Sequence, residues 1–237
     1  MKTIGSGFIL HAKPHGETAA IVTLFSEEIG KIRGLVRGGR KKRAELQTGN
    51  FGQFTWQRRL EHQLGTLTWE NTHSTAATYL DTPTALAALQ YISEVLQTAL
   101  PEEHAYPNLH IKTKELLNNL KVKDLPTKLA WWELTLLTTI GYGLSLTKET
   151  AVPCEEGTAL AYVSPNTGRA VSQKMGEPYK EKLLPLPYMF GGLEQEKQRD
   201  IATAFQLTGF FINRAMHGKK LESRNFLLTQ LSNQMRS

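Results

Sequence analysis

Five short segments with β-strand composition constrain the fold of this chain most strongly. Each is rich in β-branched, aromatic or other apolar residues, which favour strands. The segments are residues 7–13, 18–25, 30–36, 49–59 and 64–70. Short strands joined by turns that contain glycine are typical of a small closed barrel, and a barrel of five strands is often an OB-fold. We therefore expect an OB-fold in the first 78 residues.

The third segment has one basic face and runs into a cationic loop. Lys31 and Arg33 lie on the same side of an extended chain, because side chains alternate between the two faces of a strand. After two glycines come Arg40, Lys41, Lys42 and Arg43. We expect this loop to be exposed, flexible and matched by an external anion. The alternative is a charged surface loop that only improves solubility.

The positive charge of the chain is concentrated in its N-terminal part. The chain has 237 residues, of which 28 are Lys or Arg and 22 are Asp or Glu. Residues 1–80 contain 11 basic and 6 acidic residues, residues 81–150 contain 6 and 8, and residues 151–237 contain 11 and 8. This distribution favours a polyanionic partner for the N-terminal part. Nucleic acid is the commonest such partner, while a membrane surface and an acidic protein remain alternatives.

Aromatic residues accompany the cations of the fourth segment. Proteins that bind single strands without sequence preference combine a cationic groove with aromatic faces on which bases stack. Trp56 precedes two arginines, but it shares one face of its strand with Phe54, and one set of aromatic residues must fill the barrel. A second, weaker basic group lies near the C-terminus. The predicted nucleic-acid-binding residues are Lys31, Arg33, Arg37, Arg40, Lys41, Lys42, Arg43, Trp56, Arg58, Arg59, Arg214, Lys219, Lys220 and Arg224.

Helical periodicity replaces the strand pattern after about residue 80. Apolar residues recur every three or four positions, and proline or glycine stands near the segment ends. Thr82 and Ser223 are the expected N-caps of the first and last helices. The other expected helical segments are residues 108–120, 126–140 and 195–216, and the first helix ends before Pro101.

A β-hairpin pattern interrupts the helices between about residues 150 and 190. Residues 160–164 and 169–172 flank Pro165-Asn166-Thr167-Gly168, which is typical of two short strands about a turn. The sequence therefore predicts an α+β multi-domain protein. Residues 1–78 form the OB-fold nucleic-acid-binding domain, and residues 79–237 form a mostly α-helical domain with a small β-hairpin insertion.

Patterns that support catalysis or metal binding are weak. Cys154 is the single cysteine, so no disulfide can form within the chain and no cysteine-based metal site can close. His11 and His15 are four residues apart, but they fall on a strand end and a turn rather than on one face of a helix. The sequence has no Walker A loop, dinucleotide fingerprint or nucleophile elbow. We therefore expect no enzymatic activity, no cofactor and no metal.

The N-terminal residues and the hydropathy pattern bear on location. Residues 1–7 lack the apolar run of a signal peptide. No stretch approaches the roughly 20 consecutive apolar residues that span a membrane. With a single cysteine, these features lead us to expect a reducing cytoplasm and no membrane partner.

A series of short motifs occurs in order along nearly the whole chain. The N-terminal motifs are Gly7-Phe8-Ile9-Leu10, His15-Gly16-Glu17, Leu24-Phe25-Ser26, Leu35-Val36-Arg37-Gly38-Gly39-Arg40 and Leu64-Gly65-Thr66-Leu67. The C-terminal motifs are Leu160-Ala161-Tyr162-Val163-Ser164-Pro165, Gly168-Arg169-Ala170-Val171-Ser172, Leu221 and Ser223-Arg224. No single motif is as specific as a nucleotide-binding loop. Their order and spacing together resemble the RecO family of bacterial recombination mediators.

The resemblance implies an N-terminal OB-fold, a C-terminal helical domain and a role in recombinational DNA repair. It implies binding to single- and double-stranded DNA, annealing of complementary strands, and help in loading RecA onto strands coated with single-strand-binding protein (SSB). The implied partners are RecR and the acidic C-terminal tail of SSB, and the implied location is the cytoplasm at the nucleoid. None of these partners follows from composition or spacing alone.

One feature departs from the family pattern. Several family members bind zinc through four cysteines in the C-terminal domain, whereas only Cys154 stands in that region here. We therefore expect a degenerate zinc-ribbon-like hairpin without zinc, in which packing replaces the folding energy that a structural metal supplies.

Three other functions fit parts of the sequence. An OB-fold RNA-binding protein without catalytic activity would distinguish RNA from DNA through 2′-hydroxyl contacts. A nuclease would need a carboxylate cluster that only the fold assembles, and it would cleave in the presence of a divalent metal. An interaction scaffold would use the basic loop only for solubility, so reversing the charge of that loop would leave DNA binding unchanged.

Overall fold

The computed structural model describes residues 2–60, 63–153, 155 and 157–236, which form two compact units. The first unit contains residues 1–125 and 221–237, and the second contains residues 126–220. Cys154 lies outside the described residues. The sequence led us to expect domains at residues 1–78 and 79–237. That division differs from these two units, and it stays a prediction.

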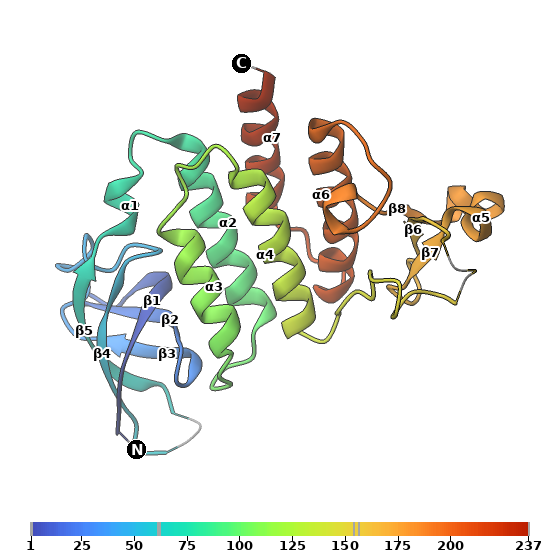
Figure 1. The fold of residues 1–237 in the computed structure, drawn as a ribbon. Coiled ribbons are helices and arrows are strands. Elements are labelled where there is room, and N and C mark those ends of the chain that lie inside the picture. The colour runs from blue at the N-terminus through green and yellow to red at the C-terminus, as the bar shows by residue number, and fades with distance from the viewer. Residues whose placement is uncertain (1, 61–62, 154, 156, 237) are drawn as a thin grey trace. The chain divides into compact units, whose positions relative to one another are not determined.

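A closed five-stranded barrel forms the N-terminal part of the first unit (Figure 1). Its strands are β1 (Lys2–His15), β2 (Ala19–Ser26), β3 (Gly30–Val36), β4 (Phe51–Gln57) and β5 (Gly65–His73). The strand order is β1-β2-β3-β5-β4, and β4 pairs with β1 to close the barrel. The β3–β5 pair is parallel, whereas the other pairs are antiparallel. The expected OB-fold class is confirmed.

Strand β1 is longer than the sequence pattern predicted. Residues 2–8 pair with β4 and residues 7–15 pair with β2, so one strand spans two neighbours in the barrel. The register shifts between Ile9 and His11, and such a bulge bends a strand between its partners. Local propensity does not reveal the first residues of β1, because the distant strand β4 supplies their hydrogen bonds.

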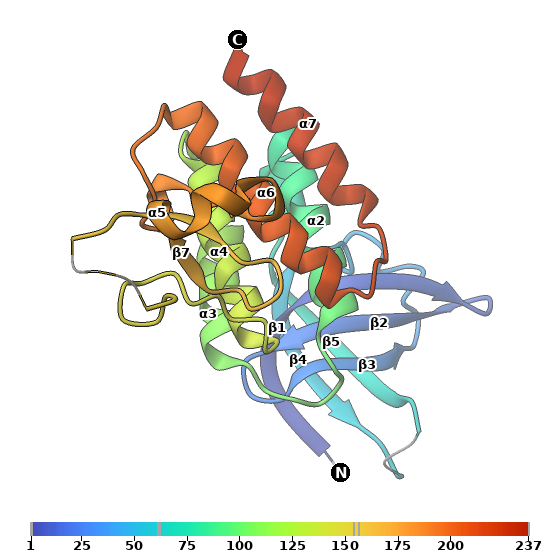
Figure 2. The same cartoon turned by 90° about the vertical axis from the view of Figure 1, so that its right-hand side faces the viewer.

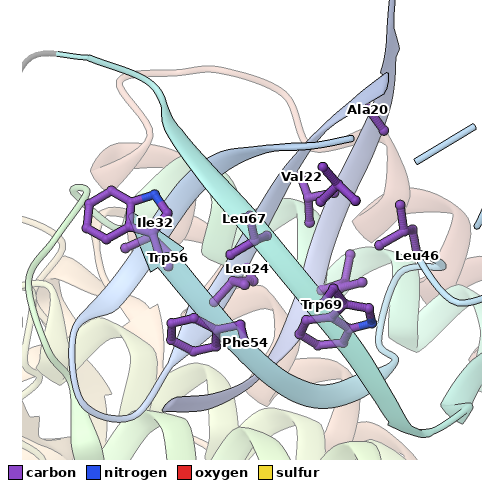
Figure 3. Close-up of a cluster of buried hydrophobic side chains, with 11 residues drawn as sticks. Ala20, Val22, Leu24, Ile32, Leu46, Phe54, Trp56, Leu67 and Trp69 are labelled. Carbon is purple, nitrogen blue, oxygen red and sulfur yellow. The ribbon is translucent and has the colours of Figure 1, made fainter. Parts of the chain in front are cut away.

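Alternate residues of the strands fill the barrel with apolar side chains (Figure 3). The core cluster consists of Ile9, Ala20, Val22, Leu24, Ile32, Val36, Leu46, Phe54, Trp56, Leu67 and Trp69. A second aromatic group surrounds Phe8, whose ring centroid lies 5.6 Å from that of Phe25 and 5.3 Å from that of Phe51. The ring of His110 also stacks on Phe8, so α3 (Pro107–Leu117) covers this second group.

Helices α1 (Thr75–Thr78), α2 (Pro83–Ala99), α3 and α7 (Glu222–Arg236) complete the first unit. Helices α2 and α7 pack side by side (Figures 1 and 2), and the Ser223 hydroxyl donates to the Glu94 carboxylate. Because α7 begins at Glu222, Ser223 lies inside the helix, and its expected position as N-cap is wrong. Thr82 does occupy the N-cap of α2, but its hydroxyl donates to Oδ1 of Asp81 (3.1 Å) and makes no capping bond.

The second unit combines most of α4 (Leu125–Thr139) and α6 (Lys197–Ala215) with a small sheet. The expected hairpin is present as β6 (Leu160–Val163) and β7 (Ala170–Ser172), and β8 (Leu184–Pro185) adds a third strand beside β6. Short helical segments follow the hairpin, namely α5 (Gln173–Gly176), η1 (Glu177–Lys182) and η2 (Tyr188–Phe190). The hydroxyl of Thr208 on α6 donates to the buried carboxylate of Glu133 on α4, which joins the two helices.

Candidate nucleic-acid interface

The cationic loop between β3 and β4 is folded against the end of the barrel. Where β3 ends, the backbone N–H of Gly39 donates to the carbonyl oxygen of Val36 (3.2 Å). The N–H of Arg40 donates to the carbonyl oxygen of Thr18 in the β1–β2 turn (3.0 Å), which ties the loop to a second element. These bonds tie the backbone of the loop to the barrel at this end, while the expected flexibility of the loop stays a prediction.

Asn50 and Leu46 anchor the far end of this loop. The side-chain Nδ2 of Asn50 donates to the carbonyl oxygens of Ala44 and Glu45, each at 3.1 Å. Asn50 is fully buried, and Leu46 belongs to the barrel core. Both anchors are buried, so they tie the far end of the loop to the barrel.

The two glycines of the loop have different roles. A Cβ at Gly39 would lie only 2.7 Å from Cβ of Ala20 on β2, so glycine is needed for the close approach of the loop to this strand. Gly38 has a φ of 67°, a backbone conformation that favours glycine. The pair therefore lets the chain leave β3, turn sharply and lie against β2.

The cations of the loop are exposed to solvent. They are Arg37, Arg40, Lys41, Lys42 and Arg43. Lys42 Nζ lies 3.6 Å from a Glu45 carboxylate oxygen, and Arg40 donates to the carbonyl oxygen of Glu17 (3.2 Å). Among the described residues, Arg37, Lys41 and Arg43 have no ion-pair partner. An exposed ion pair such as Lys42–Glu45 contributes little, so most of the loop's charge is available to an external anion.

A cleft of about 530 Å³ lies beside the loop. Arg40 and Arg43 line it from the loop, His11 and Pro14 line it from β1, and Thr48 lies on the segment that leads to β4. None of the described residues that line the cleft is acidic. An opening of this kind, with two arginines among its lining residues, suits a ligand that is bound through phosphate oxygens.

The strand β3 presents a less open basic face than the sequence predicted. Lys31 is only 9% exposed, and its Nζ donates to the carbonyl oxygen of Gln97 in α2 (2.7 Å). Burial lowers the pKa of Lys31, an effect that Glu102 opposes and Arg33 reinforces. The predicted surface position of Lys31 is therefore wrong, because the end of α2 and the turn after it cover this part of the strand.

Two predicted arginines of the barrel are engaged with the same turn. Arg33 Nη1 lies 3.5 Å from a carboxylate oxygen of Glu102. Arg58 donates from both terminal nitrogens to the two carboxylate oxygens of Glu103, at 2.5 Å for the Nη1–Oε1 pair. Local sequence patterns do not reveal Glu102 and Glu103 as partners, because these residues lie far from both arginines along the chain.

Trp56 is buried inside the barrel, which corrects its predicted role in base stacking (Figure 3). Its side chain is 3% exposed, and its indole Nε1 donates to the carbonyl oxygen of Arg33 (3.0 Å). The guanidinium carbon of Arg58 lies 4.6 Å from the centroid of the indole ring. Trp56 shares its strand face with Phe54, and it is this face that fills the barrel.

The remaining predicted cations are spread over both units. Arg59 is exposed in the first unit, where Arg224 is half-buried. The second unit contains Arg214, which donates to the carbonyl oxygen of Pro165 (2.7 Å), and the exposed residues Lys219 and Lys220. A nucleic-acid contact at these residues stays a prediction.

Two further features are the histidine pair of the N-terminal strand and the hydropathy of the helices. His11 and His15 both belong to β1 and are exposed. In the part of the chain that the structure describes, no group of three or more His, Cys, Asp or Glu residues could hold a metal ion. No helix in the same part of the chain combines the length and apolar character needed to cross a bilayer.

His110 on α3 is a buried ionisable residue that the sequence analysis missed. Its ring is stacked on Phe8 and meets Phe25 edge-on, and the residue is 3% exposed. Burial and the neighbouring Lys114 lower the pKa of His110 to about 4, although Glu28 raises it. The sequence pattern that could have revealed its burial is the helical spacing of residue 110 with the buried residues 113 and 117 on one face of α3.

The chain matches known families along most of its length. Residues 1–74 match the family model described as Recombination protein O N terminal, and residues 80–225 match Recombination protein O C terminal. A protein of Rhodospirillum centenum described as DNA repair protein RecO is 38% identical over 216 residues, which cover 90% of this chain and 86% of that protein. Proteins of the same description from Ruegeria sp. and Paracoccus denitrificans are 40% and 39% identical, over 87% and 90% of this chain and 86% of each relative.

Proposed function

Because the chain belongs to the RecO family of DNA repair proteins, we propose that it binds single- and double-stranded DNA and anneals complementary strands. The family identity supports a role in DNA repair and recombination. The observation that carries the finer proposal is the folded cationic loop, residues 37–46, at the end of an OB-fold barrel. Its exposed cations and the adjoining cleft lie together in the first unit.

The proposed mechanism is electrostatic. Phosphates of two strands bind the cations of the loop and cleft, which lowers the mutual repulsion of the strands and lets complementary bases meet. Arginine and lysine contacts to phosphates position a strand but do not read its sequence, so sequence preference is small. Binding releases counterions from the DNA, so affinity depends strongly on salt.

The proposed activity requires no covalent chemistry. Annealing forms hydrogen bonds and base stacks between two strands, and the protein only has to bring them together. The sequence lacks the recognised motifs for nucleotide binding and for an activated nucleophile, which supports a mediator rather than an enzyme.

The proposal extends to protein partners on the basis of the family. The chain assists RecA loading on strands coated with SSB, in cooperation with RecR and through the acidic C-terminal tail of SSB. It acts in the cytoplasm at the nucleoid, where these strands arise. The charge of the tail is complementary to the net positive charge of +6 of the chain.

Strand annealing tests this proposal most directly. Two complementary labelled oligonucleotides are coated with SSB and mixed with the wild type or with a variant carrying Arg40→Glu, Lys41→Glu, Lys42→Glu and Arg43→Glu. The matched control reverses the charge of four exposed lysines that do not belong to the loop, namely Lys112, Lys123, Lys148 and Lys197. We expect the wild type and the control to anneal the strands and the folded loop variant to fail.

Each result has a clear consequence. Absence of annealing by the wild type argues against the proposed mediator function. Equal annealing by the wild type and the loop variant keeps the function but removes the loop as its site. Binding is also compared for DNA and RNA oligonucleotides of one sequence, because a large preference for RNA favours the RNA-binding alternative.

A further inference from the structure

An acidic turn after α2 lies along the edge of β3 in the first unit. The turn contains Glu102 and Glu103, and Glu102 forms an isolated parallel β-bridge with Lys31. The N–H of Glu103 donates to the carbonyl oxygen of Lys31 (2.8 Å). The Nζ of Lys31 in turn donates to Gln97 near the end of α2 (2.7 Å), so both backbone and side chain hold the turn against the strand.

The position of this turn is built into the backbone on both sides. Gly30, at the start of β3, has a φ of 73°, and a Cβ there would overlap the carbonyl oxygen of His104. Glu103 has a φ of 58°, in the left-handed region that residues with a side chain rarely adopt. This conformation persists because the surrounding contacts hold it. The turn is thus placed where its carboxylates meet the barrel.

The carboxylates of the turn are paired with two arginines of the first unit. Arg58 forms a bidentate pair with Glu103, and arginine binds phosphate in the same fork geometry. Arg33 lies 3.5 Å from Glu102, and both of these side chains are about half exposed, at 49% and 46%. Within the first unit, the cations of residues 37–43 have no such partner from this turn.

We infer that the turn formed by Glu102 and Glu103 is an internal competitor for DNA phosphates that masks a second phosphate-binding site, made by Arg33 on β3 and Arg58 just after β4. This inference rests on the proposed function. In the masked state, DNA contacts only the cationic loop, through its cations at residues 37–43. When the turn is displaced or neutralised, a strand extends its contacts from the loop to the two arginines.

The test compares two pairs of substitutions that change net charge equally. The unmasking variant carries Glu102→Gln and Glu103→Gln, and the control carries Glu70→Gln and Glu115→Gln, two exposed residues of the first unit outside the turn. Affinity for a single-stranded oligonucleotide is measured by fluorescence anisotropy over a range of salt concentrations. Thermal unfolding checks that each variant is folded.

The unmasking variant is expected to gain two phosphate contacts, which makes its log–log salt slope steeper by about 1.4. Its advantage over the control therefore grows roughly sevenfold when salt falls from about 200 to about 50 mM. Adding Arg33→Gln and Arg58→Gln removes this gain if the arginines are the unmasked site. A turn that only holds α2 against the barrel would lower the stability of the variant without raising its affinity.

The outcomes separate this inference from the proposed function. If the wild type binds DNA and the unmasking variant behaves like the control, the inference is overturned and the function stands. If neither binds DNA, both are overturned. If only the unmasking variant binds, the mask is supported and the loop is not sufficient as a site. Should the double variant fail to fold, Glu102→Gln alone tests the half-exposed pair, with a slope steeper by about 0.7.

Discussion

The imidazole of His110 lies nearly parallel to the ring of Phe8, with 5.4 Å between ring centroids and 26° between planes. This contact joins α3 to β1 and places an ionisable ring in an apolar layer that also includes Phe25. Neither ring nitrogen has a hydrogen-bond partner among the described residues. The neutral ring is therefore the form that suits the folded protein.

The low pKa of His110 predicts that stability falls in mild acid. Its pKa is about 4 in the folded protein against 6.5 for an unperturbed histidine, so the unfolded chain binds the proton more tightly. The stabilisation is complete above the unfolded pKa and is lost as pH falls from about 6.5 towards about 4. We expect a loss of about 2 kcal/mol in the free energy of unfolding between about pH 7.5 and about pH 5 from this residue.

Urea unfolding of the wild type and His110→Phe at both pH values measures this effect. The phenyl ring keeps the contacts with Phe8 and Phe25 but cannot titrate. Lys114, Glu27 and Glu28 face the histidine and remain in both proteins, so their contribution largely cancels. An equal loss of stability in the two proteins would contradict the prediction.

The cationic loop predicts a steep salt dependence of DNA binding. If about five phosphates are neutralised by its five cations, the log–log slope for single-stranded DNA is roughly −3.5. We expect Lys41→Gln to make the slope shallower by about 0.7, because one phosphate contact is lost. Lys112→Gln on α3 serves as the control and should leave the slope unchanged. A wild-type slope near zero would rule out this model of binding.

Substitution of the buried Asn50 is expected to lower both the stability of the protein and its affinity for DNA. Asn50→Ala removes both hydrogen bonds to the loop carbonyls of Ala44 and Glu45, and we expect about 1–3 kcal/mol of destabilisation from the unpaired buried groups. Weaker DNA binding should accompany this loss, because the loop is no longer held at its far end. Asn119→Ala removes a comparable bond to Glu115 at an exposed site and is the matched control. Unfolding by urea and DNA anisotropy measure the two effects, and a variant that is destabilised but binds normally would separate them.

Substitution of Trp56 is expected to lower the stability of the protein rather than its capacity to stack on DNA bases. Trp56→Ala empties a large part of the barrel core and should cost about 3–5 kcal/mol in the free energy of unfolding. Trp56→Phe keeps most of the apolar volume but loses the bond from Nε1 to Arg33, so its cost should be smaller. Binding titrations of folded Trp56→Phe should give the wild-type affinity for single-stranded DNA. A marked loss of affinity without a loss of stability would restore the stacking role.

Much of the architecture could be predicted from local patterns. The expected third strand and helix α2 agree with the structure almost to the residue, because alternation and helical periodicity record which face is buried. The hairpin of β6 and β7 was marked by its turn residues. The ends of β1 were not predicted, because its first residues depend on pairing with β4.

The sequence by itself determined the alternation of buried and exposed faces, the cationic loop and the family. These depend on residue order over short distances, where side-chain periodicity and charge act directly. Only the tertiary structure decided which of two aromatic sets enters the barrel, which cations remain open and which are paired. Arg58 and Glu103 are 45 residues apart, and their pairing depends on where α2 ends against β3. Because an ion pair acts over a few ångströms of space rather than along the chain, the unpaired and ion-paired cations of the barrel became distinct only in the fold.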